Sequence, residues 1–344
     1  MKKIFFSLVA LAAIAACSKS EVEYDNPAEI GFAPVAKISA KSAVSDAIYP
    51  TTLSMYIFAN AGNATDAIGG YSTPYFKNAT FAHRSNGVFG GAPTAYYWPN
   101  VKKLIFSGYS ASGNVASLLT PPTYEWNGDN NWEIKINGYE PGTGTATEGN
   151  NDLMWFPTTP AYGKADVPGT DDTAEKDDNI EVVMQHACAW VTINIKGDNV
   201  TGADGTTWKI TDISFDNLSQ SGNVTLGTVA TWTSITTGDD FEVFANTNGK
   251  ELTTEYVDYT KETIKDLVIV PQDTKTIYVT YKYISQADLD PIEEILPIEL
   301  TYPSDEGWKA GKHYTYNITI GTKEILVEPT VKAWDTVATD AIVM

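Results

Sequence analysis

Short runs of alternating apolar and polar residues recur along most of the chain, and they predict β-strands. Such runs place every second side chain on one face, which is the spacing of a half-buried strand. They occupy residues 53–57, 104–106, 132–136, 191–195, 277–281 and 314–320. Turn-forming clusters of Gly, Asn, Asp and Thr separate them at residues 61–63, 128–131, 197–199 and 246–249. The pattern predicts an all-β protein built as sandwiches.

A polar segment from Pro157 to Asn179 divides the chain into two parts of similar length. It carries Pro and Gly together with an acidic cluster at residues 171–178, and it shows no hydrophobic periodicity. This composition is typical of a solvated loop or linker. With 344 residues, 43% of them hydrophobic, the chain is long enough for two cores. We expect one sandwich domain over residues 17–179 and a second over residues 180–344.

The first seventeen residues have the layout of an export signal. Lys2 and Lys3 precede an apolar run from Ile4 to Ala16, which is too short to span a bilayer as a helix. Small residues then lead directly to Cys17, an arrangement that resembles a bacterial lipobox. We expect residues 1–16 to be a lipoprotein signal peptide and Cys17 to carry the lipid. The alternative is an ordinary signal peptide followed by a chance cysteine.

Charge and cysteine content narrow the choice of partners. The net charge is −20, and removal of Lys2 and Lys3 with the signal peptide lowers it to −22. Phosphate backbones and anionic headgroups repel such a surface, so nucleic acid is not an expected partner. The expected membrane contact is the lipid carried by Cys17. Because Cys188 is the only other cysteine, we expect no intramolecular disulfide once Cys17 is lipidated.

Few residues suggest catalysis or metal binding. His186 and Cys188 stand two residues apart, which would place them on one side of a strand. A nucleophile with its base is one interpretation, and a buried thiol beside a strand-end histidine is the favoured one. The acidic cluster at 171–178 is either a calcium loop or a solvated linker, but it lacks EF-hand spacing. We therefore expect no catalytic, cofactor or metal residues.

The densest aromatic group is Tyr96-Tyr97-Trp98-Pro99. Aromatic faces stack on sugar rings, so this group is a candidate ligand platform. Most aromatics of the chain lie within the alternating runs, however, and packing in a core is the favoured interpretation.

Several landmarks resemble the fimbrillins of Bacteroidetes. They follow the order of that family from Cys17 to Trp334, and so span nearly the whole mature chain. The landmarks are residues 96–99 with 104–109, residues 152–155, 185–193, 268–272, 308–320, and Ile325, Pro329, Val331 and Trp334. The resemblance implies two transthyretin-like Greek-key β-sandwich domains in tandem. It also implies a structural subunit of a type V pilus, exported as a lipoprotein to the outer membrane and fimbrium, whose partners are other pilus subunits.

In that family an N-terminal strand plugs a groove until proteolysis removes it, and a C-terminal strand of a neighbouring subunit then takes its place. Residues near 28–38 fit the plug, because Ile30, Phe32 and Ile38 fall on one face. Residues 335–344 fit a donor strand, with Val337, Ala341 and Val343 on one face. Well-studied stalk subunits are cut after arginine. Here the single arginine is Arg84, and only Lys37 and Lys41 offer basic sites just after the plug.

Three functions therefore stay open, in a clear order. The first is a stalk or anchor subunit that polymerises by strand exchange and supports adhesion. The second is a surface lipoprotein or pilus-tip adhesin that binds glycan, host protein or a bacterial surface through exposed aromatics. An enzyme is a distant third, because no set of polar residues converges on one site.

Overall fold

The computed structural model describes residues 28–36, 53–84, 87–111, 120–128, 131–141, 152–166, 179–198, 207–236, 238, 240–260, 267–273, 275–284, 292–300, 307–321 and 325–333. Strands make up nearly all of its regular structure, with two short 3₁₀ turns, η1 (Ile68–Gly70) and η3 (Lys164–Asp166). In this described part, no helix has the length and apolar character needed to cross a bilayer. The predicted all-β class is confirmed.

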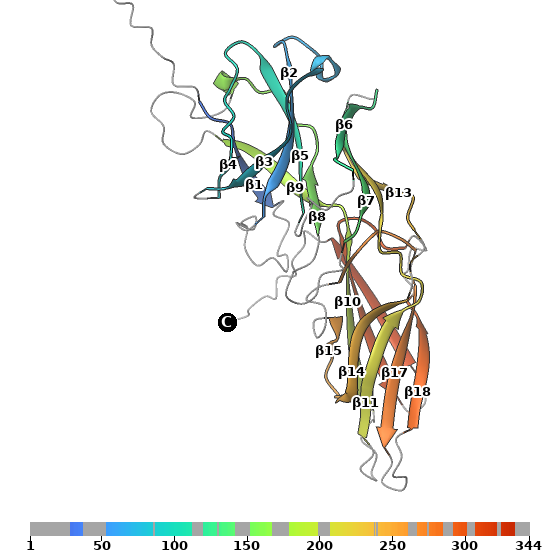
Figure 1. Ribbon diagram of the computed structural model, residues 1–344. Coiled ribbons are helices and arrows are strands. Elements are labelled where there is room, and N and C mark those ends of the chain that lie inside the picture. The colour runs from blue at the N-terminus through green and yellow to red at the C-terminus, as the bar shows by residue number, and fades with distance from the viewer. Residues whose placement is uncertain are drawn as a thin grey trace, which may run out of the picture.

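The strands form an elongated molecule with a closed barrel at one end and a pair of facing sheets at the other (Figure 1). Seven described strands close the N-terminal barrel. In spatial order they are β1 (Gly31–Ala36), β4 (Phe89–Gly91), β3 (Thr73–His83), β2 (Met55–Gly62), β5 (Lys103–Ala111), β8 (Leu153–Phe156) and β9 (Asn179–His186). Its interior is apolar and rich in phenylalanine.

The C-terminal half is a sandwich of two sheets. The first contains β15 (Val257–Asp258), β10 (Ala189–Asp198), β19 (Lys312–Gly321) and β20 (Ile325–Ala333), with β16 (Leu267–Ile269) also paired to β10. The second contains β14 (Phe241–Glu251), β11 (Thr207–Phe215), β17 (Thr276–Ile284) and β18 (Ile292–Glu299). Their facing side chains form one buried cluster, in which Trp308 and Phe215 meet edge to face with ring centroids 5.6 Å apart.

A third sheet joins strands from both halves of the chain, and we call it the bridging sheet. It lies beside the junction between barrel and sandwich (Figure 1). Its order is β13 (Ala230–Thr233), β12 (Gly222–Leu226), β7 (Trp132–Tyr139) and β6 (Thr123–Trp126). β7 and β12 pair directly although they are far apart in sequence. The halves are thus connected by a shared sheet as well as by the chain.

The cluster beneath the bridging sheet draws on all three parts of the molecule. Ile134 and Ile136 of β7 pack with Tyr109 of barrel strand β5 and with Trp190 of β10. Two indole N–H groups form hydrogen bonds across this cluster. Trp155 donates one to the carbonyl of Gly227 at 3.0 Å. Trp232 donates another to the carbonyl of Ala187 at 2.6 Å.

The transition between the halves differs from the sequence expectation in one detail. The sequence predicts that His186 and Cys188 share one strand. His186 instead ends β9, residues 187–188 form a bend, and β10 begins at Ala189. β9 starts at Asn179, where the linker was expected to end, and it pairs with β1 and β8 of the barrel.

Several residues singled out in the sequence fall outside the described part. These are Cys17, Lys37, Ile38, Lys41, the acidic cluster at 171–178, and Val337, Ala341 and Val343 of the C-terminal tail.

Candidate assembly site around strand β1

Strand β1 lies in the wall of the barrel between β4 and β9. It runs parallel to β9, with all six of its residues in register from Gly31↔Asn179 to Ala36↔Met184. It runs antiparallel to β4, and within the described part of the chain that pairing covers Gly31 and Phe32 only. The predicted plug segment is therefore a strand of the sheet.

The side chains of this segment help to fill the barrel. Ile30 and Phe32 are both 0% exposed, and Pro34 is also buried. The ring of Phe32 meets those of Phe81 and Phe106 edge to face, with centroids 5.1 and 5.2 Å away. Edge-to-face packing adds to the free energy gained from burial alone. Ile30 and Phe32, which alternate with polar or small residues in the sequence, therefore both face the barrel interior.

The three residues before β1 are held by the aromatic segment 96–98. Ile30 donates its backbone N–H to the carbonyl of Tyr96 at 2.8 Å, and Trp98 donates to the carbonyl of Ala28 at 3.0 Å. Glu29 lies opposite Tyr97 in this short antiparallel bridge. The segment 28–30, which we call the leader of β1, is thus paired along one edge.

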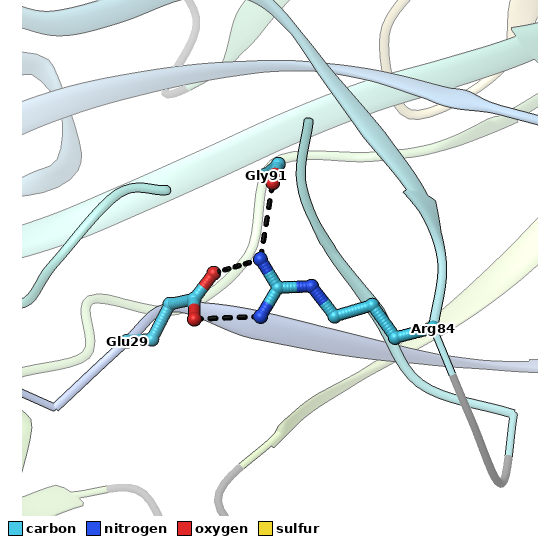
Figure 2. A network of polar contacts seen from close by, with 3 residues as sticks. All are labelled: Glu29, Arg84 and Gly91. Carbon is cyan, nitrogen blue, oxygen red and sulfur yellow. Dashed lines mark hydrogen bonds and ion pairs between the residues drawn. The ribbon is translucent and has the colours of Figure 1, made fainter. Parts of the chain in front are cut away.

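Arg84 also binds the leader, through its side chain (Figure 2). Its Nη1 donates a hydrogen bond to Glu29 Oε2 at 2.6 Å, and its Nη2 forms an ion pair with Glu29 Oε1. The same Nη2 donates to the carbonyl of Gly91 at 3.1 Å. The hydrogen bond and charge of Glu29 raise the pKa of Arg84 above its ordinary value. No local feature of the sequence indicates this contact, because Glu29 and Arg84 are 55 residues apart.

The aromatic group at 96–99 serves mainly in packing. Trp98 is 4% exposed and meets Phe106 edge to face at 5.8 Å. Tyr96 stacks on Phe81 with centroids 5.7 Å apart. Tyr97 alone is exposed, at 42%. Two of the three rings are therefore turned toward the barrel core, as the favoured interpretation required.

His186 and Cys188 do not form a nucleophile–base pair in this geometry. Nδ1 of His186 lies 2.7 Å from Oδ2 of Asp152, and Cys188 is completely buried among apolar side chains. Burial, with a smaller contribution from the charge of Asp152, raises the pKa of the Cys188 thiol well above its ordinary value. Since the thiolate is the reactive form, a neutral buried thiol is inert. Among the described residues, no three His, Cys, Asp or Glu side chains gather as metal ligands.

Comparison with known proteins places this architecture in a family. The fimbrillin-like family model matches residues 51–334, which is most of the chain. The chain belongs to the fimbrillin-like family. No curated protein matches the chain.

Solved structures agree with this fimbrillin-like fold. A fimbrial protein from Bacteroides vulgatus has a TM-score of 0.58 at 15% identity, covering 89% of this chain and 99% of that one. A candidate cell adhesion protein from Bacteroides uniformis has a TM-score of 0.52 at 17% identity, with 90% and 99% coverage. Identities this low establish the fold alone.

The family match begins at Thr51, after β1, and ends at Trp334, before the C-terminal tail. The two segments that the sequence analysis assigned to strand exchange therefore lie outside it. Family membership supports a fimbrial role for this fimbrillin-like protein at the cell surface. The function of β1 has to be argued from its own contacts.

Proposed function

We propose that this fimbrillin-like protein is a structural, non-catalytic subunit of a type V fimbria, in the stalk or at the anchor, and that it assembles by donor-strand exchange. The observation that carries the proposal is β1 with its leader, which fill the barrel with Phe32 and Ile30, while among the described residues β1 pairs with β4 at Gly31 and Phe32 alone. A barrel that loses such a strand exposes apolar side chains and two unpaired edges, which invites another strand.

The incoming strand would come from the C-terminal tail of a neighbouring subunit. Residues 335–344 carry Val337, Ala341 and Val343 on one face. Each buried Val or Ile side chain contributes about 1.5–3 kcal/mol, and the main-chain hydrogen bonds to β9 and β4 add to this. These side chains are smaller than Phe32, so the tail would fill the barrel less completely than β1 does. The tail therefore cannot displace an intact β1, and β1 must be removed before exchange can proceed.

Proteolysis after β1 would remove it. β1 ends at Ala36, and Lys37 and Lys41 follow in sequence. Arg84 is bound to Glu29 and belongs to the barrel, so cleavage after arginine would not separate β1 from the rest. A protease that accepts lysine fits a stalk subunit, whereas an uncut chain fits an anchor.

We also propose that Cys17 carries a lipid that holds the precursor at the outer membrane. The test is a Cys17→Ala variant expressed in the native host with a labelled fatty acid. We expect loss of the label and release of the protein from the membrane fraction. Label retained in the variant would contradict the lipoprotein assignment.

For the domain organisation we propose two transthyretin-like domains in tandem, the first closed into the barrel and the second open as the two-sheet sandwich, with a boundary close to the expected residue 179. Because β9 pairs with β1 and β8, we place the boundary after β9, at the bend of residues 187–188. The bridging sheet is then an interdomain element.

Polymerisation of trimmed protein tests the assembly mechanism. Three soluble chains are compared: residues 18–344, residues 42–344, and residues 42–334. We expect the first to stay monomeric, the second to form ladders of polymer on a non-reducing gel without boiling, and the third to form none. Assembly of the third chain, or failure of the second while folded, would contradict strand exchange through the tail.

A surface adhesin that binds glycan or protein is the second candidate. One observation favours it: Tyr75 and Tyr97 are exposed at 40% and 42%, and the Tyr75 hydroxyl donates a hydrogen bond to the Tyr97 carbonyl at 2.6 Å. Two adjacent exposed tyrosines offer a surface for stacking. Glycan-array binding by monomer, abolished by Tyr97→Ala, would favour this role.

A further inference from the structure

Strand β1 is held unevenly along its length. At its N-terminal end, Gly31 and Phe32 pair with β4 on one side and β9 on the other. Among the described residues, the remainder of the strand, from Ala33 to Ala36, pairs with β9 alone. The leader before Gly31 is paired as well, to residues 96–98. The main-chain contacts of this segment are therefore concentrated at its start.

Arg84 reinforces the same end from across the sheet. It directly follows β3, and β4 lies between β3 and β1. Its side chain lies against the backbone of Gly90 in β4, where an added methyl group would collide with Arg84 Nε. The guanidinium then meets the carboxylate of Glu29 on the far side of β4 (Figure 2). One side chain thus links β3, β4 and the leader of β1.

We propose that Arg84 is a positioning residue for strand exchange. Its ion pair with Glu29 is a latch that retains the N-terminal end of β1. β1 consequently leaves the barrel from the Ala36 end, and the latch opens last. The inference rests on the proposed strand exchange for its biological meaning, but the latch itself is a property of the unassembled subunit.

The position of the basic residues fits this order of events. Lys37 follows Ala36 directly, so a cut there frees the weakly held end of β1. The cleaved fragment then stays bound through the leader until Arg84 releases Glu29. Such retention protects the apolar barrel interior until a neighbouring strand arrives, because an open groove is an aggregation hazard.

The pair combines one directional hydrogen bond, from Arg84 Nη1 to Glu29 Oε2, with an ion pair between Nη2 and Oε1. The two side chains are 45% and 29% exposed, for Arg84 and Glu29 respectively, so water and salt weaken the pair. On this basis the latch changes the local opening equilibrium of residues 28–36 by about 1.5-fold to fivefold.

Hydrogen–deuterium exchange on the monomer measures that equilibrium. The protein is the mature chain with Cys17→Ala, and the readout is the exchange rate of peptides covering residues 28–36. We expect Arg84→Gln to speed exchange about 1.5-fold to fivefold. Gly90→Ala should act in the same direction with both charges retained, because its methyl displaces the Arg84 side chain.

A matched control is Lys135→Gln. It breaks the Lys135–Glu125 ion pair in the bridging sheet, whose nitrogen–oxygen distance is 2.7 Å and whose side chains are 44% and 53% exposed. It should leave exchange at 28–36 unchanged. The doubly substituted Glu29→Arg, Arg84→Glu chain should restore slower exchange than either single change.

The proposal is overturned by unchanged exchange at 28–36 in a folded Arg84→Gln protein. If that variant does not fold, the salt dependence of exchange in the wild-type chain tests the latch instead. Addition of about 0.5 M NaCl screens exposed charges and should speed exchange at 28–36 relative to β19. No relative change would equally overturn the latch. All these measurements use monomers, so they test the latch alone. Failure of strand exchange would be detected separately, in the polymerisation assay.

Discussion

At the scale of single residues, Phe32 is expected to contribute strongly to the stability of the barrel. It is completely buried and contacts two further phenylalanine rings edge to face. Phe32→Ala leaves a cavity that the closed sheet cannot easily collapse, so we expect the free energy of unfolding to fall by about 3–5 kcal/mol. Urea denaturation measures it.

Tyr97→Ala is the control for that measurement. It removes an aromatic ring of similar size from the surface of the same region, where it is 42% exposed. We expect a change within about 0.5 kcal/mol. Equal losses from the two substitutions would show that β1 is not packed into the barrel.

Cys188 should be chemically silent in the folded protein. Burial raises the pKa of its thiol well above the ordinary value, so the thiolate is scarce at neutral and mildly alkaline pH. We expect the Cys17→Ala chain to resist iodoacetamide at pH 8 and to take up one equivalent when unfolded in urea. Mass spectrometry gives the count. Rapid labelling without denaturant would contradict the buried position.

At the scale of elements, the alternation of apolar residues predicted individual strands well. The run at 191–195 lies within β10 and the run at 314–320 within β19, each with its apolar residues in the sandwich core. The run at 132–136 lies within β7. These strands have one apolar and one polar face, so period two is visible in the sequence.

The alternation of apolar residues does not reveal strands that are buried on both faces. It also does not indicate which strands pair with each other. β5 is buried at Leu104 through Ala111, because one face lines the barrel and the other packs under the bridging sheet. Alternation specifies a face but not a neighbour, so the β7–β12 pairing and the parallel β1–β9 pairing left no local signal. The contact of Arg84 with Glu29 depends on those pairings and was hidden for the same reason.

The bridging sheet offers an element-scale prediction. Trp155→Phe keeps an aromatic ring but removes the hydrogen bond to the Gly227 carbonyl. We expect a loss of about 1–3 kcal/mol, because a buried acceptor is left without its donor. Equilibrium denaturation measures the loss.

Trp126→Phe is a suitable comparison in the same sheet. Its indole N–H makes no hydrogen bond to the described residues, and its ring is only partly buried. This substitution should cost clearly less than Trp155→Phe. A larger stability loss for Trp126→Phe than for Trp155→Phe would mean that the indole N–H of Trp155 does not stabilise the β12–β13 hairpin.

At the scale of the whole molecule, the cluster under the bridging sheet should make the two halves unfold together. Leu226 belongs to that cluster along with residues of the barrel and of β10. We expect Leu226→Ala to lower stability by about 2–5 kcal/mol and to shift one common thermal transition. Calorimetry, with hydrogen exchange in β5 and β19, checks both halves at once.

Ile295→Ala provides the reference, since Ile295 on β18 is 66% exposed. It should leave the transition nearly unchanged. Two separate transitions in the wild-type protein, with only one moved by Leu226→Ala, would show that the halves are independent despite the shared sheet.

The pairing of β7 with β12 also determines when this protein can finish folding. Gly138, in β7, donates its backbone N–H to Asn223 at 2.9 Å across 85 residues of sequence. During synthesis or export from the N-terminus, β7 therefore emerges long before β12, the strand that pairs with it. Pairings of such high sequence separation close slowly and leave apolar surface exposed meanwhile. A chain halted before Leu226 would lack Val224 and Leu226 beside Ile134 and Ile136 in their shared apolar cluster, so the bridging sheet cannot be completed until the second half has emerged.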